Sequence, residues 1–176
     1  MLMPFNLNKW IEDNKHLLTP PVNNTVLYKD SDFIVMIIGG PNTRKDFHFN
    51  EGEELFYQLK GDMKLPIIQN GERSVIEIKE GDMFLLPPKT YHSPQRFADT
   101  IGLVIERKRS DIEFDSCTWF CDSCNEMLYS EEFRLADIVT QLKALLKKVY
   151  DSEAIRTCKK CGTVMEIPTA ENNIYA

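Results

Sequence analysis

Residues 26–106 are dominated by short runs of β-branched, aliphatic and aromatic side chains separated by turn signals. The runs lie at 33–38, 55–59, 63–69, 74–78, 83–86 and 100–107. The turn signals are the pairs Gly39-Gly40, Gly61-Asp62, Asn70-Gly71 and Gly81-Asp82. Many short strands at close spacing predict a β-sandwich or β-barrel rather than alternating βαβ units. With 176 residues, 43% of them hydrophobic, the chain can form one main domain with a proper core and an appendage.

Helical periodicity occurs on both sides of this β-rich region. Near the N-terminus, Trp10, Ile11, Asn14, Leu17 and Leu18 have roughly helical spacing, so we expect a short helix over 8–18 that Pro20-Pro21 stops. After residue 115, an apolar stripe with a period of roughly 3.6 predicts a second helix. The stripe consists of Phe133, Ile138, Leu142, Leu145, Leu146 and Val149. The predicted fold class is mainly β, with one short helix at each end of the barrel sequence.

Four of the five cysteines form two C-x-x-C pairs, Cys121 with Cys124 and Cys158 with Cys161. In a chain without a recognisable secretory leader, this spacing favours metal thiolates over disulfides. Four thiolates form a tetrahedral site with no open position, so we expect a structural metal, either iron or zinc. The pairs bracket the predicted C-terminal helix and should hold it against the barrel. Cys117 is left as an unligated thiol.

These patterns divide the chain into two parts. Residues 1–115 are expected to form the barrel together with the N-terminal helix. Residues 116–176 are expected to form the C-terminal helix and the four-cysteine site, packed on the barrel.

The charge balance excludes some partners. The formal net charge is −6, so no large positive field is present to attract nucleic acid or an anionic membrane surface. No stretch approaches the roughly 20 apolar residues of a membrane span, and residues 1–14 lack the pattern of a signal peptide. We therefore expect a cytoplasmic protein that binds neither nucleic acid nor membrane.

Charged side chains occur where a barrel interior should be apolar. Arg44, Asp46 and His48 share one parity, so on an extended strand they point to the same face. Burying them is costly unless they bind something, which predicts a buried polar site. Glu54 keeps the parity of His48 if the strand resumes in register after the turn at 50–52, and we prefer it to the adjacent Glu53.

A second histidine completes a recognisable ligand set. His92 follows a short apolar strand and Pro87-Pro88, where a strand is expected to re-enter the barrel. Two histidines and one carboxylate match the triad that binds non-haem Fe(II) and leaves positions open for substrate and dioxygen. Singly, each residue is more simply explained as a satisfied core or strand-end side chain. The patterned spacing favours a catalytic metal site at His48, Glu54 and His92.

The spacing of these residues resembles the two motifs of the cupin superfamily. His48-Phe49-Asn50, followed by Glu54 and Gly61, resembles the first motif, and Gly81, Pro87, His92 and Arg96 resemble the second. The resemblance implies a double-stranded β-helix, or jelly-roll barrel. The chain departs from the general pattern at Asn50, where a second histidine is usual, at Lys89, where glycine is usual, and at Arg96, where asparagine is usual. The first departure reduces four ligands to three.

Longer segments resemble one family within the cupins, the 3-hydroxyanthranilate 3,4-dioxygenases. They are R-x-D-x-H at 44–48, EELFYQLKGDM at 53–63, HSPQR at 92–96 and VIER at 104–107. The two cysteine pairs resemble the form of that family with a rubredoxin-like metal site. The resemblance implies an enzyme with Fe(II) as cofactor, dioxygen as co-substrate and a small aromatic acid as substrate. It also implies a homodimer and a place between tryptophan and quinolinate.

The same resemblance assigns roles to residues around the metal. Arg96 is expected to bind the substrate carboxylate, and Arg44 the substrate or dioxygen, because arginine's planar fork suits such groups. Glu106 should accept a proton from the substrate hydroxyl or amine or hydrogen-bond to it, and Glu54 should also contact the substrate. Asp46 is expected to orient a ligand from outside the coordination sphere.

The charged residues around the metal also fit a purely structural role. Arg44, Arg96 and Glu106 could form an ion-pair network that only holds the barrel together. The fold hosts further reactions on small acids, as well as proteins that only bind a ligand or dock a partner, and fold alone does not decide among them. A pair of arginines beside an open three-ligand metal favours the dioxygenase.

Overall fold

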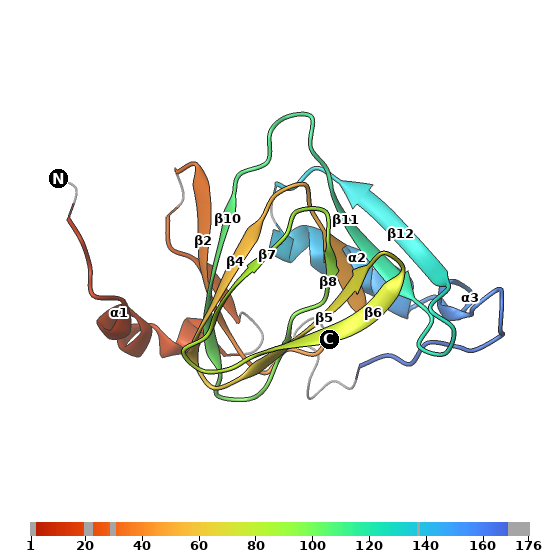
Figure 1. The fold of residues 1–176 in the computed structure, drawn as a ribbon, viewed down its shortest axis with the longest axis horizontal. Coiled ribbons are helices and arrows are strands. Elements are labelled where there is room, and N and C mark those ends of the chain that lie inside the picture. Colours follow the sequence, from red (N-terminus) through yellow and green to blue (C-terminus); the bar gives the residue numbers. More distant parts are fainter. Residues whose placement is uncertain (1–2, 20–22, 29–30, 137, 169–176) are drawn as a thin grey trace.

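The structure is a computed structural model that describes residues 3–19, 23–28, 31–136 and 138–168 (Figure 1). Strands form two sheets, and the described helices lie near the ends of the chain. The predicted mainly β fold is confirmed. Among the described residues, no helix is both long enough and apolar enough to span a membrane.

The smaller sheet has five strands in the order β1-β2-β10-β4-β7. Their bounds are Asn24–Val26 (β1), Phe33–Gly39 (β2), Ile101–Arg107 (β10), Glu54–Lys60 (β4) and Met83–Leu86 (β7). All its strand pairs are antiparallel. Strands β4 and β10 are distant in sequence, so their residues meet only through the fold.

The larger sheet has seven strands in the order β12-β11-β3-β8-β5-β6, with β9 also paired to β5. Their bounds are Met127–Phe133 (β12), Asp115–Phe120 (β11), Asp46–Phe49 (β3), Tyr91–His92 (β8), Met63–Gln69 (β5), Glu72–Ile78 (β6) and Gln95–Arg96 (β9). The register places His48 directly opposite both Cys117 on β11 and His92 on β8.

The two sheets face each other across one hydrophobic core. Met36, Phe56, Leu86 and Val104 come from the smaller sheet and pack with Met63, Leu65, Ile67 and Ile78 from the larger one. On β4 the side chains alternate, with Glu54, Phe56 and Gln58 buried and the intervening residues half-buried. The same period on β10 buries Gly102, Val104 and Glu106. Polar side chains therefore enter the barrel on the same strand faces as core residues.

The N-terminal helix is shorter than the predicted span of 8–18. Helix α1 covers Leu7–Asp13 and is followed by a 3-10 turn over Lys15–Leu17. The side chain of Asn6 caps α1 by accepting a hydrogen bond from the Lys9 amide at 2.9 Å. Buried Ile11 and Leu18 pack with Ile37 of β2, so this segment covers part of the outer face of the smaller sheet. Pro20 and Pro21 lie outside the described residues.

The C-terminal part contains more strand than the sequence predicted. Phe133, assigned to the helical stripe, is the last residue of β12, and helix α2 covers only Ile138–Tyr150. A short helix α3 follows at Glu153–Arg156. Leu142, Leu145, Leu146 and Val149 of α2 are buried against Cys117 and Trp119 of β11, whereas the side chain of Ile138 lies outside the described residues.

The division of the chain at residue 115 stays a prediction. Strand β11 begins at Asp115 and pairs with β3, so the larger sheet continues across that position.

Candidate active site

Three side chains from three strands converge inside the barrel. His48 projects from β3, Glu54 from β4 and His92 from β8, and their ligand atoms all lie within 4.8 Å of one another. All three residues are buried, whereas the competing Glu53 is exposed. The structure thus brings together the three residues that the sequence suggested as metal ligands. Two imidazoles and one carboxylate form a donor set that fits a divalent transition metal.

Hydrogen bonds fix the orientation of His92. Its Nδ1 lies 3.0 Å from the carbonyl oxygen of Thr90, and its Nε2 lies 3.1 Å from Oε2 of Glu54. Burial favours neutral His92, but the Glu54 carboxylate outweighs burial and raises the pKa of His92. Conversely, burial would raise the pKa of Glu54, but His92 and His48 lower it. Glu54 is therefore ionised at neutral pH and available as a ligand.

Asn50 supports the carboxylate where the general cupin pattern has a histidine. It is buried, and its Nδ2 donates a 3.4 Å hydrogen bond to Oε2 of Glu54. Its Oδ1 accepts a 2.8 Å hydrogen bond from the Gly52 amide, which fixes the side-chain amide in this orientation. Asn50 therefore contacts Glu54 by hydrogen bonding.

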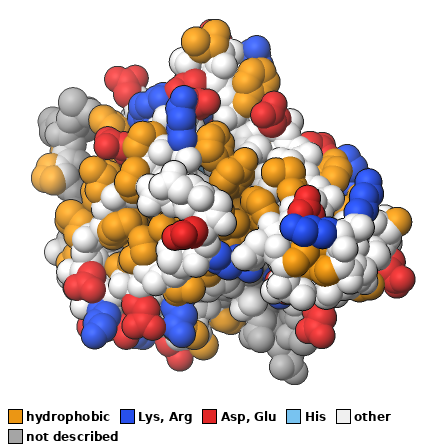
Figure 2. All heavy atoms as spheres, turned by 45° about the vertical axis from the view of Figure 1, so that its right-hand side comes forward, with side chains coloured by type: hydrophobic (Ala, Val, Ile, Leu, Met, Phe, Trp, Pro, Cys, Tyr) orange, Lys and Arg blue, Asp and Glu red, His pale blue; other side chains and the backbone are white. Residues whose placement is uncertain are grey.

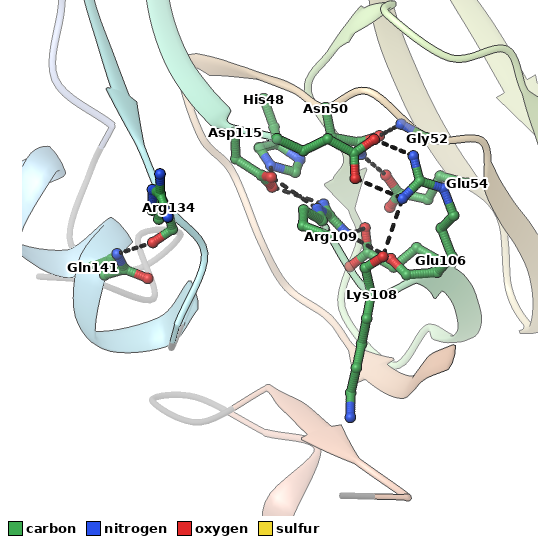
Figure 3. A network of polar contacts seen from close by, with 12 residues as sticks. His48, Asn50, Gly52, Glu54, Glu106, Lys108, Arg109, Asp115, Arg134 and Gln141 are labelled. Atoms are coloured by element: carbon green, nitrogen blue, oxygen red, sulfur yellow. Dashed lines mark hydrogen bonds and ion pairs between the residues drawn. The ribbon is translucent and has the colours of Figure 1, made fainter. Parts of the chain in front are cut away.

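An ion-pair network that the sequence did not reveal surrounds His48 (Figure 3). Asp115 Oδ2 lies 2.7 Å from Nε2 of His48, and Arg109 donates to both oxygens of Asp115 at 2.8 and 2.7 Å. Burial lowers the pKa of His48 more than Asp115 raises it, so its imidazole is neutral. A carboxylate bound to one ring nitrogen orients an imidazole and leaves the other nitrogen for a metal.

Arg109 also reaches Glu106, the carboxylate that β10 projects into the barrel. Its Nη1 lies 2.7 Å from Oε2 of Glu106, and Figure 3 shows the guanidinium between Glu106 and Asp115. Glu106 stands opposite Glu54 in the register of β10 and β4. Burial, reinforced by the charge of Glu54, raises the pKa of Glu106 to about 7. Its Oε2 has no aligned hydrogen-bond donor among the described residues, so it can accept one from a ligand.

Arg96 is the most deeply buried of the arginines near the site, with 3% of its surface exposed. Its Nη1 donates a 3.0 Å hydrogen bond to Oε1 of Gln58, and its Nε has no hydrogen-bond partner among the described residues. Burial lowers the pKa of Arg96 to about 10, so the guanidinium remains positive at neutral pH. A buried cation with a vacant donor is an arrangement that suits an anionic ligand.

Arg44 is held differently. It donates to both carboxylate oxygens of Asp46, with the Nε bond at 2.9 Å and a shorter one from Nη2. Asp46 is fully buried and holds Arg44 through these two hydrogen bonds. The carboxylate that contacts His48, one of the three candidate metal ligands, is that of Asp115. The positive charge of Arg44 partly opposes the rise in the pKa of His92 that Glu54 causes.

The four paired cysteines form a separate cluster, with their sulfur atoms within 4.8 Å of one another. Each C-x-x-C pair lies in a turn, here called a knuckle, and the two knuckles share one backbone hydrogen bond and one positive φ angle. The amide of Asn125 donates to the Cys121 carbonyl at 3.0 Å, and that of Gly162 to the Cys158 carbonyl at 2.9 Å. Asn125 and Gly162 both have positive φ, which glycine and asparagine adopt readily. The arrangement fits a closed four-thiolate metal site. Cys117 is free and buried, and burial raises its pKa.

Sequence reasoning missed four residues that shape the site. Gln58 shares its parity with Glu54 on β4, and Gly102 shares its parity with Glu106 on β10, so periodicity could have identified both. Asp115 and Arg109 gave no such signal. Asp115 reaches His48 only because β11 pairs with β3, and Arg109 lies outside any strand.

Comparison with known proteins identifies similar chains over nearly the whole length. The family model described as 3-hydroxyanthranilic acid dioxygenase matches residues 1–150. A 3-hydroxyanthranilate 3,4-dioxygenase of Bacillus thuringiensis (strain Al Hakam) is 50% identical over 165 residues, 93% of this chain and 92% of that protein. A protein of the same name from Neurospora crassa is 48% identical over 93% of this chain and 90% of its own length. The one from Scheffersomyces stipitis is 50% identical over 92% of this chain and 94% of its own length. A solved cupin-2 domain protein from Shewanella frigidimarina aligns at 16% identity with a TM-score of 0.46, covering 60% of this chain and 94% of that one.

Proposed function

The chain belongs to the 3-hydroxyanthranilic acid dioxygenase family, and we propose that it opens the aromatic ring of 3-hydroxyanthranilate with dioxygen. The product is 2-amino-3-carboxymuconate semialdehyde, on the route from tryptophan to quinolinate and NAD. The observation that carries this proposal is the buried His48, Glu54 and His92 cluster in the same barrel as Arg96, whose Nε has no hydrogen-bond partner among the described residues. Metal ligands and a receptor for a carboxylate thus share one barrel interior.

Fe(II) is the metal that we propose for the histidine and glutamate cluster. The donor set fits it, since two imidazoles and one carboxylate leave coordination positions open. Bound Fe(II) supplies the redox chemistry that dioxygen requires, together with positions for a substrate that chelates through its hydroxyl and amine. Glu54, ionised at neutral pH, would balance part of the charge of such a metal and is placed to contact the substrate as well.

The two arginines take different parts in binding. Arg96 offers its unpartnered Nε to the ring carboxylate in a buried position, where a charge-assisted hydrogen bond is strong. Arg44 is held by Asp46 and contributes its charge near the substrate or dioxygen. Anchoring the carboxylate at Arg96 fixes the orientation of the ring, and this orientation determines which ring atoms face the metal.

Glu106 is the group that we propose for proton transfer. Its raised pKa, about 7, leaves a large fraction ionised at neutral pH and able to accept a proton from the substrate hydroxyl or amine. Arg109 holds the carboxylate from the side facing Asp115, so Oε2 keeps a defined position during this exchange.

The four-cysteine site has a structural role in this proposal. Four thiolates leave no position for a substrate, and either iron or zinc fits. The second knuckle follows α2 and α3, and the first follows β11 directly, so the metal ties the C-terminal helices to the larger sheet. Thiolate ligands and free cysteines suit the reducing cytoplasm, where we place the protein.

A homodimer is the assembly that we propose. Figure 2 shows one face of the molecule on which hydrophobic side chains gather. The outer side of the smaller sheet exposes Phe33, Met83 and Leu85. A groove of about 420 Å³ beside them has apolar walls at Phe33, Leu55, Leu85 and Ile105 and charged walls at Glu51, Glu53, Glu106 and Arg107. Exposed apolar side chains rimmed by polar ones are typical of an interaction surface, which a second subunit can cover. Sedimentation equilibrium tests the stoichiometry directly.

Product analysis tests the proposed reaction. Protein supplied with Fe(II) under anaerobic conditions is mixed with 3-hydroxyanthranilate and then with oxygen. Mass spectrometry should show a product heavier than the substrate by two oxygen atoms, or its dehydrated cyclic form. Turnover of another small acid but not of this one would indicate a different cupin reaction. Ligand binding without any oxygen-dependent product would indicate a binding protein.

A further inference from the structure

Two uncharged residues surround the guanidinium of Arg96 on the side of the smaller sheet. Gln58 on β4 and Gly102 on β10 stand directly opposite each other in the sheet register. Both face into the barrel, because they share the parity of the buried residues on their strands. On this side the buried cation therefore faces an amide and a position without a side chain, while the charge of Glu54 acts on it within the barrel.

Gln58 is held in one orientation by its own hydrogen bonds. It is 1% exposed, and its Nε2 donates to the carbonyl oxygen of Lys60 at 3.3 Å. This contact turns Oε1 toward Arg96, whose Nη1 donates to it at 3.0 Å. The amide is therefore a fixed acceptor that holds one edge of the guanidinium and leaves Nε unpartnered among the described residues.

Gly102 supplies the space that the guanidinium occupies. A Cβ atom at this position would lie 2.5 Å from Nη1 of Arg96 and 2.8 Å from Oε1 of Gln58. Any larger residue would displace either the arginine or the glutamine that holds it. Gly102 is the second residue of β10 and lies at a register shift between β10 and β4. Glycine within a strand often marks a bulge or the close approach of another group. Here that group is the side chain of Arg96.

The neutrality of Gln58 has a chemical consequence. A buried arginine is normally paired with a carboxylate of the protein, which would cancel its charge. An amide acceptor orients the guanidinium through one hydrogen bond and leaves its positive charge available to an incoming anion. The pair Arg44 and Asp46 shows the alternative within the same site, since there the carboxylate satisfies the arginine.

We propose that Gln58 and Gly102 are specificity-determining positions, which hold Arg96 in place without neutralising it and so select substrates that carry a ring carboxylate. Gln58 is a positioning residue that acts through Arg96, and Gly102 provides the room. The proposal rests on the proposed function, because it assumes that Arg96 receives the substrate carboxylate.

The decisive variant is Gln58→Glu, which keeps the shape of the side chain and adds a negative charge beside Arg96. An internal carboxylate would compete with that of the substrate. We expect the Kd for 3-hydroxyanthranilate, measured by fluorescence titration without oxygen, to rise about a hundredfold, the size of a lost buried charge-assisted contact. The Kd of 2-aminophenol, which lacks the carboxylate, should change little. Gln69→Glu on the exposed end of β5 is the matched control and should leave both values unchanged.

Two further variants separate orientation from charge. Gln58→Met removes the acceptor without adding charge, so its Kd for 3-hydroxyanthranilate should rise less, by about tenfold. Gly102→Ala should weaken 3-hydroxyanthranilate selectively by displacing the guanidinium. If the role of Gln58 is purely structural, the Glu and Met variants should bind both compounds equally more weakly, or lose thermal stability with no change in preference. Either result would overturn the proposal.

Comparison with Arg96→Ala distinguishes this proposal from the proposed function. If wild type prefers 3-hydroxyanthranilate and Arg96→Ala loses that preference while Gln58→Glu keeps it, only the role of Gln58 is wrong. If wild type itself shows no preference for the carboxylated compound, the assignment of Arg96 fails, and this inference fails with it.

Discussion

Replacing Arg96 with alanine should remove most of the discrimination for a carboxylated substrate. Arg96 is 3% exposed and its Nη1 donates a 3.0 Å hydrogen bond to Gln58, so the guanidinium lies away from bulk water. Breaking one partner of a buried charged pair costs roughly 3 to 5 kcal/mol. Since about 1.36 kcal/mol is tenfold in rate, kcat/KM should fall by around two to four orders of magnitude.

The assay compares two substrates in parallel. Wild type should use 3-hydroxyanthranilate far better than 2-aminophenol, whereas Arg96→Ala should show little preference between them. Arg96→Lys keeps the charge but loses the planar fork and should lie between the two. Arg73→Ala, on the exposed part of β6, serves as the control. If Arg96→Ala weakens both compounds equally, the arginine stabilises the barrel rather than the substrate, and the reasoning is refuted.

Four further predictions concern the metals and the proton acceptor. His92→Ala should lose the catalytic metal and turnover while its circular dichroism spectrum stays unchanged. Normal turnover with metal missing only from the cysteine site would show that the catalytic ligands have been assigned wrongly. Cys158→Ser should lower the melting temperature or solubility, because structural zinc in small thiolate domains contributes on the order of 10 kcal/mol to folding. Complete inactivation at an unchanged melting temperature, with catalytic iron retained, would contradict a structural role for the cysteine site. Asp115→Asn should weaken metal binding by roughly ten- to a hundredfold in a competition titration, since Asp115 orients His48, and an unchanged affinity would count against this role. Burial raises the pKa of Glu106 to about 7, so kcat/KM should fall as the pH decreases through that value and Glu106 gains a proton. Glu106→Gln should be slower and should not show this decrease in kcat/KM at low pH. If the variant retains the decrease, Glu106 is not the group that causes it.

Strand periodicity accounts for how much of the fold could be predicted. The runs at 63–69 and 83–86 coincide with β5, Met63–Gln69, and β7, Met83–Leu86. Turn signals lie beside both, so sequence and structure agree on their ends. Strands β8 and β9 have two residues each, too few to show any period. Strand β12 contains Ser130, Glu131 and Glu132, and this polar stretch hides it from a search for apolar runs.

The same distinction applies to the site. His48 and Glu54 were found because a charged residue at a core-facing parity is conspicuous in a strand. Gln58 carries a similar signal, on the same face of β4. Asp115 does not, because its contact with His48 depends on tertiary pairing between β11 and β3. Contacts that depend on which strands become neighbours are not encoded in any local pattern.

Oxygen uptake with 3-hydroxyanthranilate after anaerobic reconstitution with Fe(II) tests the proposed reaction most directly. We expect one molecule of oxygen to be consumed for each molecule of 3-hydroxyanthranilate, and no uptake by His48→Ala prepared in the same way. Substrate binding to the reconstituted protein without oxygen consumption would contradict the proposed dioxygenase activity, and so would equal uptake by the variant.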